Sequence, residues 1–200
     1  MSDHLIFSYA ANMNPRLIAS RCSKPEPVTV ARLPDHSLAF FGYSKRWDGG
    51  AATLIDHPGE DLWGVVYKLS FWDTERLDSW LDVRLDGTGD YFLLPTEVIG
   101  VDGTTYPVLL YRKFYHGGPQ QPPSEDYLET ILAGAVAHGL PVPYIETVRR
   151  IRTKQATFPV PRIFEREQSS TFGTMSCDCG ALNLNSALRH GDTENCFHVD

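Results

Sequence analysis

The sequence predicts an α+β fold, in which a small mixed β-barrel of about six or seven strands carries flanking helices. Short apolar or alternating segments, separated by turn residues, dominate the chain up to residue 114 and are typical of strands. Segments with helical spacing gather mainly after them, between residues 124 and 151. Strands followed by helices favour α+β over a repeated βαβ arrangement.

The expected strands are short and are bounded by Pro, Gly and Asp. They cover residues 5–7, 28–33, 38–41, 51–55, 62–69, 91–99 and 106–114. The last two are expected to form a hairpin, because Asp102-Gly103 lies between them and Asp-Gly is a strong hairpin signal. The segment 38–41 is apolar on both faces, which indicates a buried strand.

Helices are predicted over residues 15–22, 75–80, 124–139 and 144–151. The first begins at Pro15, since Pro is favoured in the first turn of a helix. Thr74 is the expected N-cap of the second, whose Leu77 and Leu81 lie on one face. Helical periodicity fades from residue 152. We therefore expect one domain over 1–151 and a C-terminal extension over 152–200 that is partly mobile.

Composition narrows the class of partner. The net charge is -7 and there is no basic block, which argues against nucleic acid. No stretch approaches the roughly 18 apolar residues of a membrane helix, and the N-terminus lacks the features of a signal peptide. The 4 Cys do not form the pattern of a secreted disulfide scaffold. We expect a cytoplasmic protein; composition says little about its substrate, and the oligomeric state is not indicated.

One short stretch has the features of a ligand-binding loop. An apolar strand at 5–7 leads into Tyr9-Ala10-Ala11-Asn12, and a helix follows Pro15. The two alanines let the backbone approach a ligand closely, and N–H groups at such a junction form an anion-binding concavity. Strand, loop and helix in this order can aim backbone donors at a carboxylate or an oxyanion. The alternative is a buried strand followed by an ordinary turn.

Several segments match, in order, those of the gamma-glutamylcyclotransferases. They are Tyr9–Met13 (where that family usually has Tyr-Gly-Ser-Asn-Met), Ala31–Leu33 with Leu38–Phe40, Trp47–Leu54, Pro58–Tyr67, Leu77-Asp78, Pro122–Ser124 with Tyr127, Gly134-Ala135 and Gly139–Pro141. The chain thus resembles this family over roughly residues 5–150. The resemblance implies a small mixed barrel with flanking helices and an enzyme that needs neither cofactor nor metal.

The resemblance also implies a reaction. The α-amine of a γ-glutamyl amide attacks its own γ-carbonyl, which gives 5-oxoproline and a free amine. A carboxylate of raised pKa would take the proton from the α-ammonium and return it to the leaving amine. The substrate would lie against the loop residues Tyr9, Ala10, Ala11 and Asn12, with Tyr127 as a further contact.

The match breaks at the proton carrier. The family has Leu-Asp-x-x-Glu-Gly-Val, and the ungapped segment here places Leu81 at the Glu position and Asp82 at the Gly position. Asp82 is one candidate replacement, and Asp86 is another if one residue is inserted. The alternative for both residues is that they are exposed loop carboxylates with no role in catalysis. The alternatives are then a repurposed enzyme acting on another amide or amino-acid-derived substrate, or a binding module without turnover.

Two further features leave alternatives open. Ala10 replaces the family's Gly, which would strain the loop by about 1 kcal/mol if that position has a positive φ. Cys177, Cys179, Cys196 and His198 are enough for a tetrahedral zinc site, but their spacing is unusual, and a disulfide or chance are alternatives. We therefore predict no metal. Cys22 is expected to be buried and inert.

Overall fold

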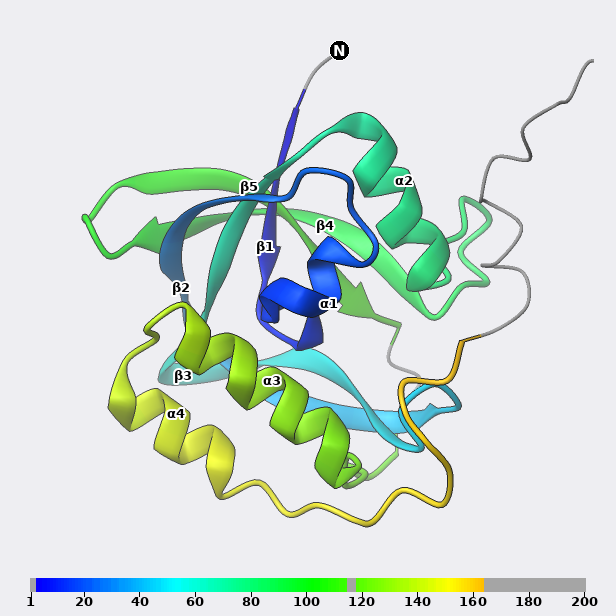
Figure 1. The fold of residues 1–200 in the computed structure, drawn as a ribbon. Helices are drawn as coiled ribbons and strands as arrows, with labels where there is room; N and C mark the ends of the chain where they lie inside the picture. Colours follow the sequence, from blue (N-terminus) through cyan, green and yellow to red (C-terminus); the bar gives the residue numbers. More distant parts are fainter. Residues whose placement is uncertain (1–2, 115–117, 164–200) are drawn as a thin grey trace, which may run out of the picture.

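The computed structural model describes residues 3–114 and 118–163, and these residues contain a closed, mixed β-barrel with helices outside it (Figure 1). The strand order is β1-β3-β2-β4-β5. The strands are β1 (His4–Ser8), β2 (Glu26–Ser44), β3 (Gly49–Leu69), β4 (Tyr91–Gly100) and β5 (Thr105–Lys113). β1 closes the barrel by pairing parallel with β5, while the other pairs are antiparallel. The predicted fold class is confirmed.

The barrel has fewer and longer strands than the sequence suggests. The expected strands 28–33 and 38–41 both belong to β2, and 51–55 and 62–69 both belong to β3. The turn residues between them mark an irregularity inside a continuous hairpin. The register shifts between Pro34 and His36, and Asp35 has φ 57. The Asp35 carboxylate accepts a hydrogen bond from the Gly59 N–H at 2.8 Å, which holds the two irregular segments together.

The helices lie close to their predicted positions. They are η1 (Ala11–Met13), α1 (Pro15–Ala19), α2 (Phe71–Trp80), α3 (Glu125–Ala137) and α4 (Val142–Arg149). Asn14 caps α1 by accepting from the N–H groups of Arg16 and Leu17. Ser124 caps α3 by accepting from the Tyr127 N–H, at the predicted start of this helix. The predicted start of α2 is wrong, because Ser70 is the N-cap and Thr74 lies inside the helix.

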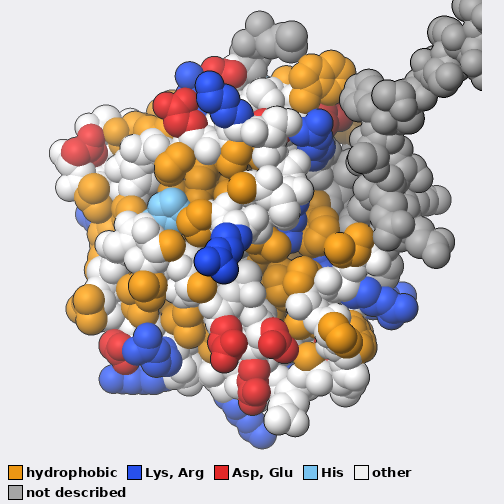
Figure 2. Space-filling view, viewed as in Figure 1, with side chains coloured by type: hydrophobic (Ala, Val, Ile, Leu, Met, Phe, Trp, Pro, Cys, Tyr) orange, Lys and Arg blue, Asp and Glu red, His pale blue; other side chains and the backbone are white. Residues whose placement is uncertain are grey.

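Helix α3 packs against the loop that follows β1. Gly134 makes this possible, since a Cβ at that position would lie 2.6 Å from the backbone nitrogen of Asn14. The outer face of α3 carries acidic side chains, which Figure 2 shows gathered on this side of the molecule. The inner face places Tyr127 and Ile131 in the core. Helix α3 therefore supports the 9–14 segment from outside the barrel.

After α4 the chain returns along α3 towards the turn between β2 and β3 (Figure 1). This is the described part of the expected extension, residues 152–163, and its backbone pairs with the segment that leads into α3. Lys154 donates its N–H to the Pro123 carbonyl at 3.0 Å, and the Glu125 N–H donates to the Lys154 carbonyl at 2.9 Å. In the described part of the chain, no helix has the length and apolar character needed to span a bilayer.

Candidate functional site

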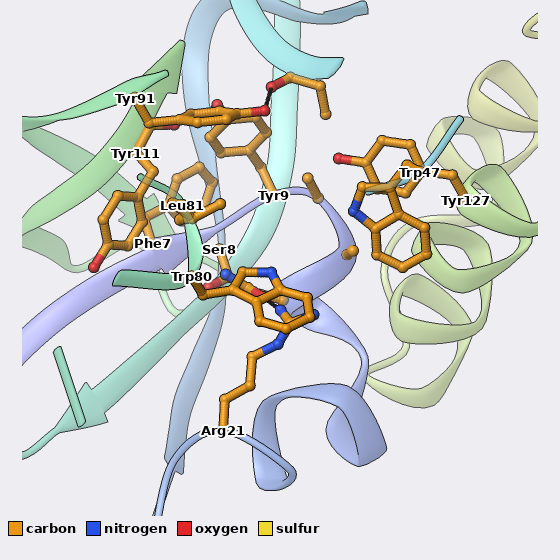
Figure 3. A pocket seen from close by; sticks show the side chains of 14 residues that line it. Phe7, Ser8, Tyr9, Arg21, Trp47, Trp80, Leu81, Tyr91, Tyr111 and Tyr127 are labelled. Carbon is orange, nitrogen blue, oxygen red and sulfur yellow. Dashed lines mark hydrogen bonds between the residues drawn. The ribbon is translucent and has the colours of Figure 1, made fainter. Parts of the chain in front are cut away.

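A pocket opens where β1 ends, and half of the residues that line it are aromatic (Figure 3). The aromatic lining residues are Phe7, Tyr9, Trp47, Trp80, Tyr91, Tyr111 and Tyr127. The other lining residues are Ser8, Ala10, Ala11, Asn12, Arg21, Ala52 and Leu81. Among these described lining residues, Arg21 carries a full charge and none is a carboxylic acid.

The structure brings the predicted substrate-binding residues to this one pocket. Tyr9, Ala10, Ala11 and Asn12 follow β1 directly, and Tyr127 reaches the pocket from α3. Ala10 has φ -124, so the strain expected for a positive φ at that position is absent. The two alanines leave the backbone of the loop accessible, in keeping with their small side chains.

The 9–12 loop is held in place by hydrogen bonds on both sides. The Tyr9 hydroxyl donates to the Tyr111 carbonyl at 2.5 Å, and Arg21 Nη1 donates to Asn12 Oδ1. The Met13 N–H donates to the Ala10 carbonyl at 2.9 Å and closes the single turn of η1. The first N–H groups of a helix have no partner within that helix. The loop is thus a fixed backbone turn whose first N–H groups are not used by η1 itself.

Stacked rings make the other side of the pocket rigid. The rings of Trp47 and Tyr127 lie parallel, with centroids 4.3 Å apart and an interplanar angle of 13°. The Tyr91 hydroxyl donates to the Ala52 carbonyl at 2.9 Å. Burial raises the pKa values of Tyr91 and Tyr127 well above the ordinary value of a phenol, so both are neutral. These rings shape the pocket and carry no charge.

Trp80 is clamped between two cations at the mouth of the pocket. The guanidinium carbon of Arg21 lies 3.5 Å and that of Arg46 3.6 Å from the Trp80 ring centroid. Two guanidinium groups cannot share one face at such distances, so they lie on opposite faces. Each such contact stabilises by about 0.5–1 kcal/mol at an exposed site. Arg46 Nη2 also donates to the Trp80 carbonyl at 3.2 Å.

Leu81, and not a carboxylate, faces the pocket from the end of α2. Asp82 has φ 52 and turns the chain out of the helix, a conformation that Asp tolerates better than most residues. Its carboxylate accepts from Arg84 Nε at 2.9 Å and is 46% exposed. The exposed Asp86 carboxylate accepts from the Thr88 N–H at 3.0 Å. Neither borders the pocket, and their assignment as proton carriers stays a prediction.

A carboxylate that sequence reasoning did not single out lies behind the pocket wall. The Tyr111 hydroxyl donates to Asp78 Oδ1 at 2.7 Å, and Figure 3 shows this hydroxyl pointing away from the side of Trp47 and Tyr127. Asp78 is half-buried, and burial raises its pKa. Its position three residues before Leu81 places both on one face of α2. That spacing was the available signal, but the partner Tyr111 is remote in sequence.

Metal and thiol chemistry find no support within residues 3–114 and 118–163. No group of His, Cys, Asp and Glu there could hold a metal ion. The possible zinc ligands Cys177, Cys179, Cys196 and His198 lie outside the described residues. The prediction that Cys22 is buried is confirmed, and burial raises the pKa of its thiol to about 12. A protonated, buried thiol is a poor nucleophile.

Comparison with known proteins points to one family. The model of the AIG2-like family matches residues 61–148. The gamma-glutamylcyclotransferase of Homo sapiens is 30% identical over 165 residues, which is 80% of this chain and 85% of the human protein. The protein of the same name from Mus musculus is 30% identical over 155 residues, or 76% of this chain and 80% of the mouse protein.

Solved structures agree with the sequence comparison. A structure of a gamma-glutamyl cyclotransferase superposes with a TM-score of 0.73 at 29% identity, covering 84% of this chain and 97% of that one. YkqA from Bacillus subtilis shares the fold, with a TM-score of 0.63 at 18% identity over 77% of this chain and 57% of that one. The same fold is therefore found at 29% identity in the first structure and at 18% in the second.

Proposed function

This chain belongs to the gamma-glutamylcyclotransferase family, and we propose that it cleaves a γ-glutamyl amide by intramolecular cyclisation, releasing 5-oxoproline and a free amine. The observation that carries the proposal is that the positions aligned with the family's motifs line one pocket, including position 81, where Leu replaces the family's Glu. Tyr9–Asn12, Leu81 and Tyr127 come from three separate parts of the chain and meet there.

The pocket suits the glutamyl part of such a substrate. Backbone donors of the 9–12 loop can bind an α-carboxylate or the oxyanion that forms at the γ-carbon. The positive charge of Arg21 beside Asn12 favours the same anionic groups. The ring faces of Trp47 and Tyr127 can pack on the glutamyl methylenes and attract an ammonium group.

The reaction needs little beyond this positioning. Amine and carbonyl belong to one molecule, and a well-oriented intramolecular reaction gains about 7–11 kcal/mol over the bimolecular one. What the pocket wall lacks, in its described residues, is a group to take the proton. A role for Asp82 or Asp86 requires movement of the 82–90 loop. Without such movement, the substrate amine must lose its proton to water, and the rate should rise with pH up to the pKa of the substrate α-amine, which lies above the roughly 8 of a chain terminus because the α-carboxylate beside it is ionised.

The experiment is a 5-oxoproline release assay on γ-glutamyl amides from about pH 6 to about pH 10, a range that brackets the α-amino pKa. Wild type is compared with Asp82→Asn, Asp86→Asn and the control Asp102→Asn, whose exposed carboxylate lies in the β4–β5 turn. A loss of about 100-fold in one of the first two variants identifies it as the proton carrier. If no γ-glutamyl amide yields 5-oxoproline at any pH, the proposal is wrong.

A second candidate is binding without turnover, or turnover of another amide or amino-acid-derived substrate. The observation that favours it is Leu81 at the family's glutamate position, since a leucine cannot transfer a proton. Calorimetric titration with 5-oxoproline and with γ-glutamyl amides separates the candidates. Tight binding together with no product after prolonged incubation supports the binding module.

We also propose a setting for this activity: the cytoplasm, with glutathione-related γ-glutamyl compounds as the substrate class. The support is indirect. The acidic net charge of -7 disfavours nucleic acid as a partner. No cofactor or metal is needed for the cyclisation. Fractionation of cells, followed by detection of the protein, tests the location, and the release assay with γ-glutamyl dipeptides and tripeptides tests the substrate class.

A further inference from the structure

Asp48 is a buried carboxylate that does not border the pocket. It is 2% exposed and lies in the turn between β2 and β3. Its Oδ1 accepts from the Tyr43 hydroxyl at 2.5 Å and from Lys154 Nζ at 3.0 Å. Its Oδ2 accepts from the N–H of Thr157 and from the Thr157 hydroxyl at 2.8 Å. These donors, the Thr157 N–H first, hold the pKa of Asp48 below its usual range.

The turn that carries Asp48 is also packed against the segment leading into α3. The Gly50 N–H donates to the Pro122 carbonyl at 2.9 Å. A Cβ at Gly49 would lie 2.5 Å from the backbone nitrogen of Ser124, so the turn approaches the start of α3 as closely as a glycine allows. The position of Asp48 is therefore linked to that of Tyr127 one turn into the helix.

Residues 152–163, which we call the strap, form hydrogen bonds with both sequence neighbours of Trp47, which are Arg46 and Asp48. On one side, Asp48 binds Lys154 and Thr157. On the other side, the Arg162 N–H donates to the Arg46 carbonyl at 2.8 Å, and Arg46 Nη1 donates to the Arg162 carbonyl at 3.1 Å. The strap also pairs by its backbone with the start of α3. It therefore connects the two elements that supply Trp47 and Tyr127.

Trp47 is the residue that this arrangement delivers to the pocket. It is 5% exposed, stacks on Tyr127 and lines the pocket beside it (Figure 3). Its two sequence neighbours point their polar groups at the strap, while its own ring points at the site. A change in the strap would thus be transmitted to the pocket wall without touching a ligand.

We propose that Asp48 is a positioning residue of the pocket, and that by binding Lys154 and Thr157 it makes the strap part of the site and sets Trp47 against Tyr127. This inference goes beyond the proposed function, because it concerns the shape of the pocket whatever is turned over there. The strap is then a required wall support, and not a dispensable start of the C-terminal extension.

The test reads Trp47 directly. The full chain is labelled with fluorotryptophan, and the fluorine NMR signals of its 4 Trp residues are assigned by Trp→Phe variants. Asp48→Asn and Thr157→Val should shift the Trp47 signal by more than its linewidth and leave that of the exposed Trp72 unchanged. Thr157→Ser, which keeps the hydroxyl donor, should restore the wild-type signal. Asp61→Asn, which removes a carboxylate paired with Arg32 on the same strand pair, is the matched control.

A second readout separates positioning from general damage. If the release assay detects turnover, Asp48→Asn and Thr157→Val should raise KM about tenfold, which corresponds to 1.36 kcal/mol of lost binding. The value of kcat should change by less than about twofold, because these variants alter the pocket wall and not the reacting groups. A Trp47 signal that stays at its wild-type position in folded Thr157→Val overturns the inference, even if Asp48→Asn fails to fold. Failure of the proposed function removes only the kinetic readout, because the NMR readout needs no substrate.

Discussion

Replacing Leu81 by Glu should create the proton carrier that the pocket lacks. Leu81 is the C-cap of α2, is partly buried and faces the pocket, so a Glu there would reach the space beside the 9–12 loop. Burial and the negative end of the helix dipole both raise the pKa of a carboxyl at this position towards neutrality. A base of such pKa is suited to catalysis near pH 7.

The expected gain follows from the kind of catalysis added. Positioned general acid–base catalysis contributes about 100-fold to 10,000-fold. We expect the lower value, about 100-fold in kcat or about 2.7 kcal/mol, because the pocket evolved around a leucine. The base acts only when ionised, so the variant's rate should rise at a lower pH than that of wild type, whose rise follows the deprotonation of the substrate amine.

The assay is 5-oxoproline release as a function of pH for wild type, Leu81→Glu and the isosteric control Leu81→Gln. The glutamine variant carries the same loss of apolar packing and cannot transfer a proton. Equal rates and equal pH profiles for the Glu and Gln variants would refute the reasoning, because position 81 would then have no access to the reacting atoms.

Three further predictions follow from the described contacts. If the 82–90 loop keeps its position, Asp82→Asn and Asp86→Asn each change kcat in the release assay by less than about twofold, since a carboxylate that does not touch the substrate adds no general-base term. Gly134→Ala should destabilise the fold by about 1–3 kcal/mol in urea unfolding and weaken ligand binding, because the new Cβ displaces the backbone at Asn14. The control Ala133→Ser, on the exposed face of α3, should change stability by less than about 0.5 kcal/mol. Asp78 has a raised pKa in the folded state, so folded stability declines as pH rises above its unfolded value of about 3.9, and Asp78→Asn should cost less stability at neutral pH than at about pH 4. An Asp78→Asn penalty that is the same at both pH values contradicts the role of burial.

Local patterns were sufficient for the fold class and for the loop at the end of β1, whereas the roles of the site residues stay predictions. Alternation and turn residues predicted the strands, and the small residues after β1 indicated the loop that lines the pocket. The same rules divided β2 and β3 at Pro34 and Pro58, because a proline in a bulge and a proline in a turn look alike in sequence. The N-cap of α2 was misplaced since Ser70 and Thr74 are both good caps, and only the Asp73 N–H to Ser70 contact distinguishes them.

The parts that sequence could not supply depend on residues remote along the chain. The Tyr111–Asp78 hydrogen bond and the Asp48–Thr157 contact join segments with no shared periodicity. The stacking of Trp47 on Tyr127 likewise requires that the β2–β3 turn meet α3. Leu81 was predicted to occupy the glutamate position, but whether Asp82 could replace it depended on a backbone φ that no pattern encodes.

The closure of the barrel sets the order in which the chain can fold. Strand β1 is synthesised first, yet its register partners are as distant as Leu69 on β3 and Leu109 on β5. The hairpin of β2 and β3 can form from neighbouring residues, and β1 can join it once Leu69 is available. The pairing of β1 with β5, which closes the barrel, must wait until more than half of the chain has left the ribosome. The contact between β1 and β5, at the strand that leads into the 9–12 loop, is thus the last pairing of the barrel to form. A bulky fusion placed at the N-terminus should slow this step more than one at the other end, and refolding kinetics of the two fusions would measure it.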